Sequence, residues 1–151
     1  MRLSQIEAQC VTAFEGAARQ HRALVYHAFE DLYQRILIAG LRCTVFVNGS
    51  FLTEKKIPDD VDVIVAIDDD ATRTLSPEQR NLVVDLHNPS FIPKVQIWAG
   101  TAYPLGHPFR GSVADFSCAC QMFGIEHSEI WLKGYVVMMP GETDVGIRIC
   151  R

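Results

Sequence analysis

The chain has 151 residues, 48% of them hydrophobic and 21% charged, and a formal net charge of −4. This is the size and composition of one globular domain; it excludes long disorder and any general electrostatic attraction to nucleic acid or anionic membranes. Because no apolar run reaches about 18 residues and the N-terminus lacks the pattern of a secretory leader, we expect a cytoplasmic protein with no membrane partner. The five cysteines contain no C-x-x-C pair, which favours free thiols over a structural zinc site.

The first forty residues predict two helices. Residues 3–19 are rich in Ala, Glu and Gln and lack the alternation of a strand. Between residues 21 and 38 apolar pairs recur every four residues, with Arg22 expected off the apolar face. Gly40 is placed to end this second helix.

Two short strands and a helix follow. Residues 43–47 and 61–67 are β-branched runs, and in the second run Val61 to Ile67 alternate so that the odd-numbered residues share one face and Asp62 lies on the other. Ser76 is expected to cap a helix over residues 77–86. A third strand is expected over residues 94–99.

The last third of the chain predicts a loop over residues 100–111, a helix over 112–123, and strands over 135–139 and 145–149. With no repeat or linker, the pattern indicates a single α/β or α+β domain spanning residues 1–151, with N-terminal helices in 1–40 and a core in 41–151.

A Gly-Ser pair and an acidic strand are candidates for a phosphate-binding and metal-binding site. Gly49 lets backbone N–H groups approach a phosphate, Ser50 adds a hydroxyl, and residues 50–56 could begin a short helix. Asp60 and Asp62 place two carboxylates on one face of a strand, a donor set that suits Mg²⁺. Lys55, between the two halves, is a further candidate for phosphate contact, although exposed loop lysines are usually only solvated.

A plainer interpretation stays open. Each half alone is ordinary, since Gly-Ser after a strand is commonly a turn and Asp at a strand end is commonly a solvated rim. The protein would then be an α/β interaction module, and Gly49 and Ser50 would lie far from Asp60 and Asp62.

The pattern apolar-Gly-Ser, nine residues, Asp-Val-Asp-Val resembles the signature of the DNA polymerase beta-like nucleotidyltransferase superfamily. The fuller stretch from Asn48-Gly-Ser-Phe-Leu-Thr to Pro58-Asp-Asp-Val-Asp62 is similar to small bacterial and phage-borne members of unknown role. The resemblance implies a small mixed β-sheet flanked by helices. It also implies that Gly49 and Ser50 hold the triphosphate of a nucleotide and that Asp60 and Asp62 hold Mg²⁺ or Mn²⁺.

One position departs from that superfamily. Its third acidic residue comes from a neighbouring strand, where this chain carries Gln96 in Lys94-Val-Gln-Ile-Trp98. Glutamine can coordinate a metal through its carbonyl but supplies neither charge nor a base. Asp59 and Asp85 are weak candidates to replace the missing carboxylate.

Two functional hypotheses follow. The first is an Mg²⁺-dependent nucleotidyltransferase that binds a nucleoside triphosphate and transfers a nucleotidyl group to a hydroxyl on a protein, an RNA or a small molecule. The second is a degenerate member that acts through a partner, for instance in a toxin–antitoxin or phage-defence pair. A homodimer is compatible with either, and His107 and Arg110 in an aromatic loop are candidates for an acceptor pocket.

Overall fold

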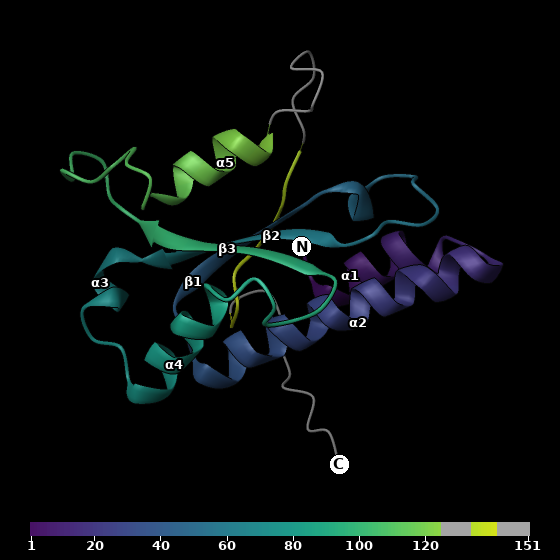
Figure 1. Cartoon of the computed structure of the whole chain (residues 1–151), viewed down its shortest axis with the longest axis horizontal. Coiled ribbons are helices and arrows are strands. Elements are labelled where there is room, and N and C mark those ends of the chain that lie inside the picture. The colour runs from purple at the N-terminus through teal and green to yellow at the C-terminus, as the bar shows by residue number, and fades with distance from the viewer. Residues whose placement is uncertain (125–133, 142–151) are drawn as a thin grey trace.

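The computed structural model describes residues 1–124 and 134–141, and its centre is a mixed four-stranded sheet (Figure 1). The strands are β1 (Cys43–Asn48), β2 (Val61–Asp68), β3 (Val95–Ala102) and β4 (Val136–Met138), in the order β3-β2-β1-β4. β1 is antiparallel to β2 and β4, whereas β2 and β3 are parallel. The expected α+β class with a mixed sheet flanked by helices is confirmed.

Helices cover the two faces of the sheet unequally (Figure 1). The lower layer in that view holds α1 (Leu3–Glu7), a π-helical segment (Ala8–Thr12), the long α2 (Gly16–Ala39) and α4 (Pro77–Leu86). α5 (Phe116–Gly124) lies over the opposite face, and the short α3 (Asp69–Thr72) directly follows β2. The main core therefore lies between α2 and the sheet.

The two N-terminal helices are present, but their boundary differs from the prediction. The first helical stretch ends at Thr12 and α2 starts at Gly16, so residues 13–15, expected to be helical, separate the two. Gly16 has φ 54°, a left-handed value that most side chains disfavour. Gly40 ends α2 as expected, with φ 62° and a bond from Leu41 N to Ile36 O of 3.3 Å.

The two-sided pattern of β2 is confirmed. Its odd-numbered residues, Val61 to Ile67, belong to the core beneath the sheet, while Ile64 and Ala66 are buried on the other side. Asp62 shares that second face at the start of the strand, where it is only half-buried. A central strand covered on both sides is usually nearly all apolar, and Asp62 is a charged exception near the start of β2.

Two expectations near the end of the chain are wrong. The loop predicted from residue 100 starts later, because β3 stays paired with β2 through Ala102; Gly100 leaves room for the Trp98 ring, which lies 2.2 Å from where a Cβ would stand. The helix predicted from residue 112 starts at Phe116, and Val113 is 86% exposed. The predicted strand over 145–149 lies outside the described residues.

The remaining structural expectations concern caps, thiols and membranes. Ser76 caps α4 through Gln79 N at 3.2 Å, as predicted. Cys10, Cys43, Cys118 and Cys120 are free thiols, and Cys150 lies outside the described residues. Within the described part of the chain, none of the helices combines the length and the apolar composition needed to span a membrane.

Candidate functional site

The Gly-Ser turn and the acidic strand meet at one end of the sheet. β1 and β2 pair so that Asn48 lies opposite Asp62, and Gly49 leaves β1 with φ 90° and ψ −178°. A Cβ on Gly49 would stand 2.2 Å from Asp62 Oδ2, far inside van der Waals contact. The Asp62 carboxylate thus rests against the glycine backbone, and the two halves of the motif form one surface.

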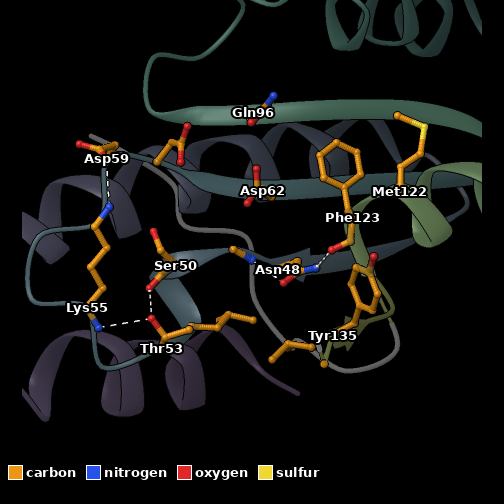
Figure 2. A pocket seen from close by; sticks show the side chains of 15 residues that line it. Asn48, Ser50, Thr53, Lys55, Asp59, Asp62, Gln96, Met122, Phe123 and Tyr135 are labelled. Atoms are coloured by element: carbon orange, nitrogen blue, oxygen red, sulfur yellow. Dashed lines mark hydrogen bonds and ion pairs between the residues drawn. The ribbon is translucent and has the colours of Figure 1, made fainter. Parts of the chain in front are cut away.

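Asn48, to which the sequence motif assigns no role, connects this turn to α5. Its side chain is 5% exposed; Oδ1 accepts from Gly49 N at 2.6 Å, and Nδ2 donates to Phe123 O at 2.8 Å. These two bonds join the start of the turn to the last residues of α5 (Figure 2). Asn48 therefore holds the end of α5 in place relative to the turn at Gly49.

Ser50 begins a turn instead of the short helix considered over residues 50–56. Only Ser50–Leu52 is helical, as one turn of 3-10 helix, and Ser50 O accepts both the Thr53 hydroxyl at 2.8 Å and Thr53 N at 3.2 Å. So short a turn has no appreciable macrodipole, so any affinity for an anion must come from local donors and cations.

Arg22 stabilises this turn from below. The helical pattern placed Arg22 off the apolar face, yet its side chain is fully buried, which corrects that prediction. Its guanidinium donates to the carbonyls of Cys10, Phe51 and Lys55 and lies 3.9 Å from the centre of the Phe14 ring. Burial lowers the pKa of Arg22 from its ordinary value. The three carbonyls accept hydrogen bonds from guanidinium N–H groups that would otherwise be buried without partners.

Lys55 and Asp59 form an exposed ion pair at the edge of the site. Lys55 Nζ lies 3.0 Å from Asp59 Oδ2, and their side chains are 48% and 85% exposed. The hydrogen bond and the charge of Lys55 lower the pKa of the Asp59 carboxyl. Asp59 is therefore a partner for the lysine and does not replace the missing third carboxylate; Asp85, exposed on α4, is not part of the cavity lining.

Asp60, Asp62 and Gln96 lie at neighbouring strand ends. Asp60 immediately precedes β2, and the parallel register places exposed Gln96 beside Asp62. The expectation that this amide stands next to the acidic pair is thus met by the strand pairing. Among the described residues, no group of three or more His, Cys, Asp or Glu side chains is arranged to hold a metal ion.

These residues line a cavity of about 980 Å³. Its polar lining includes Gly49, Ser50, Asp60, Asp62 and Gln96, together with Asn48, Thr53, Lys55 and Asp59. Figure 2 shows Ser50, Asp62 and Gln96 in this lining. The volume is at the upper end of the range for small-molecule sites.

The opposite wall of the cavity is apolar and was missed at the sequence level. It comprises Leu52, Met122, Phe123, Tyr135 and Val136. The Tyr135 hydroxyl donates to Cys120 O at 2.8 Å, and burial raises its pKa. Apart from Leu52, which belongs to the turn after Gly49, this wall is built from α5 and from the start of β4 with the residue before it, and no local pattern in either segment reveals that they meet Gly49 and Asp62.

The aromatic loop lies elsewhere. Tyr103 and His107 stack with ring centres 4.6 Å apart, and Phe109 packs against both. Arg110 donates to Tyr103 O at 2.7 Å. The loop follows the far end of β3 from Gln96, and none of these residues lines the cavity. The ring contacts anchor the loop on itself, and because His107 and Arg110 lie outside the cavity lining, this arrangement does not support the predicted acceptor pocket.

Comparison with known proteins places the chain in a family. A model of a family of unknown function (DUF6932) matches residues 1–106 of 151, so the chain belongs to that family. The matched part includes the Gly49-Ser50 turn, Asp60, Asp62 and Gln96, and it ends before α5 and Tyr135. No curated protein and no solved structure matches the chain.

Proposed function

We propose that the cavity binds a nucleoside triphosphate with Mg²⁺ and that the protein transfers the nucleotidyl group to a hydroxyl acceptor. The observation that carries this proposal is the direct contact between Gly49 and the Asp62 carboxylate. It joins a phosphate-type turn and a carboxylate pair on one side of a nucleotide-sized cavity. The plainer interpretation required the same residues to lie apart.

The donor set suits one Mg²⁺ ion. Mg²⁺ prefers one or two carboxylates, with waters and substrate phosphates completing its coordination, and the carboxylates of Asp60 and Asp62 both line the cavity. When bound, the ion offsets negative charge on the phosphates. A second ion would need a further anionic ligand, and the neighbouring strand offers the neutral amide of Gln96 in that place.

The other lining residues would position the nucleotide for the reaction. Gly49 and Ser50 would hold the phosphates, while Phe123 and Tyr135 provide apolar surface against which a base or ribose can pack. In the reaction the acceptor oxygen forms a bond to the α-phosphorus, the bond to the bridging oxygen breaks, and pyrophosphate leaves with that electron pair. Gln96 cannot take the hydroxyl proton, so the proton must pass to water or to a carboxylate.

A second candidate function rests on the same glutamine. If the loss of a third carboxylate abolishes turnover, the protein is a nucleotide-binding module that acts through a partner, as in a toxin–antitoxin or phage-defence pair. The observation that favours this alternative is the register that places Gln96 beside Asp62. A protein or RNA acceptor, a homodimer and a cytoplasmic location belong to the proposal as well.

The first experiment is thermal melting with ATP, GTP, CTP or UTP in the presence of Mg²⁺ or Mn²⁺. At a ligand concentration 100 times Kd, binding should raise Tm by about 5–10 °C. Asp62→Asn should abolish the metal-dependent shift, whereas Asp85→Asn, the same change at an exposed position on α4, should leave it intact. The absence of a shift with every nucleotide would refute the proposal.

Release of labelled pyrophosphate then separates the two candidate functions. Turnover by the native protein supports the transferase, and binding without turnover supports the nucleotide-binding module. Gln96→Asp should tighten Mg²⁺ binding in either case, because it adds an anion beside Asp62. Unchanged Mg²⁺ affinity in this variant would show that residue 96 does not face the metal.

A further inference from the structure

A strained lysine, Lys94, precedes β3 next to the acidic strand; it is not one of the residues that line the cavity. Ile92 to Val95 form a turn closed by Val95 N and Ile92 O at 3.2 Å, with Pro93 in its second position and Lys94 in its third. Lys94 has φ 67° and is the only non-glycine residue with positive φ in the described part of the chain. A turn of this type requires positive φ at its third position, where Gly or Asn is usual because other side chains crowd the backbone.

The turn is fixed to the acidic strand. Val61 N donates to Lys94 O at 3.1 Å, and the parallel pairing then begins with Val61 beside Val95. Lys94 is consequently the residue of the neighbouring chain segment nearest in register to Asp60, and it lies two residues before Gln96. Its side chain is exposed, and its charge is close enough to lower the pKa of the Asp59 carboxyl.

The charges around the cavity show what a cation at this place would do. Three carboxylates, those of Asp59, Asp60 and Asp62, line the cavity, and Lys55 is the one lysine or arginine among the described lining residues. Lys55 is already paired with Asp59, and the donors of Arg22 are directed to main-chain carbonyls. A triphosphate brings several further negative charges, so its tail needs another cation besides Lys55 and the metal.

We propose that Lys94 is a second phosphate-binding cation of this site and that, with Lys55, it binds the terminal phosphates of the nucleoside triphosphate. This inference rests on the proposed function. In the absence of ligand, Asp59 is paired with Lys55 and its carboxyl is also affected by the charge of Lys94, so arriving phosphates compete with Asp59 for these cations. A phosphate-binding role accounts for a lysine at this strained position. Gly or Asn would suit the turn better, but neither carries the ammonium group.

Three substitutions separate charge from backbone strain. Lys94→Asn tolerates positive φ but is neutral, Lys94→Arg keeps the charge, and Lys56→Asn removes an exposed lysine that lines a different cavity, beside Phe14 and Glu54. We expect the Asn variant at position 94 to melt at or above the native Tm while its affinity for Mg²⁺-ATP falls about five- to tenfold. Lys94→Arg and Lys56→Asn should bind Mg²⁺-ATP within about twofold of the native protein.

Titration calorimetry with a series of ligands shows which phosphate Lys94 contacts. The ligands are ATP, ADP, AMP and inorganic tripolyphosphate, each with Mg²⁺. If another nucleoside triphosphate gives a larger thermal shift than ATP, that nucleotide and its di- and monophosphate replace the adenosine series. The loss in Lys94→Asn should be largest for the triphosphate and tripolyphosphate and absent for the monophosphate. An equal loss for all four ligands, or no loss for any, would overturn the assignment while leaving nucleotide binding intact. If the native protein binds no nucleotide in the thermal screen, the proposed function fails and this inference with it.

Discussion

Replacing Gly49 by alanine should damage both the stability and the site, by an amount that the structure allows to be worked out. The new Cβ would stand 2.2 Å from Asp62 Oδ2, 3.1 Å from Asp62 Cγ and 3.3 Å from Asp62 N. The first contact forces the carboxylate to another rotamer, at about 0.5–1.5 kcal/mol. The backbone at φ 90° and ψ −178° is a region that is essentially restricted to glycine, which adds about 1–3 kcal/mol.

The sum predicts that Gly49→Ala lowers the free energy of unfolding by about 1.5–4.5 kcal/mol, and that Tm falls by about 3–18 °C. Urea denaturation followed by circular dichroism measures the first quantity, and the nucleotide melting assay measures the loss of binding. Gly106→Ala is the matched control, because Gly106 also has positive φ (85°) but nothing lies within 4 Å of its would-be Cβ. The control should lose stability from backbone strain alone and keep nucleotide binding.

A double-mutant cycle isolates the steric part. In an Asp62→Ala background the carboxylate that collides with the new methyl group is absent, so Gly49→Ala should cost about 1 kcal/mol less than in the native background. If the two changes are additive, and Gly49→Ala costs no more than Gly106→Ala, the proposed contact between the turn and the acidic strand is refuted.

Two further predictions concern the charges around the turn. Arg22→Met should lower the free energy of unfolding by about 2–4 kcal/mol in urea denaturation, because three carbonyls lose a buried donor. The control Arg35→Met, on an exposed face of the same helix, should lower it by less than about 1 kcal/mol. Equal losses in the two variants would contradict the role of Arg22. The Asp59 carboxyl should titrate below the ordinary value of about 3.9 when followed by NMR, and Lys55→Ala should return its pKa towards that value. Because the folded-state pKa is lowered, the contribution of this pair to stability is present above the ordinary pKa and is lost as the pH falls through the folded one; a midpoint that Lys55→Ala leaves unchanged would disprove the ion pair.

Much of the fold was predictable from local sequence, because the relevant signals act within a few residues. The end of α2 at Gly40 follows from the left-handed conformation that glycine adopts freely, and the start of α4 follows from the side-chain bond of Ser76. The alternation in β2 predicts which residues are buried beneath the sheet and leaves Asp62 on the opposite face. The sequence by itself therefore determined the strands and most of the helices, and it singled out the polar half of the candidate site.

Only the tertiary structure decided which distant groups meet. Arg22 has no local partner, and its burial depends on carbonyls from two other segments that converge on α2. The apolar wall formed by Phe123 and Tyr135, and the position of Gln96 beside Asp62, depend on strand order and register. The strain at Lys94 likewise arises from the turn that brings β3 alongside β2. Such pairings are set by global packing and loop closure, which short-range propensity and periodicity do not encode.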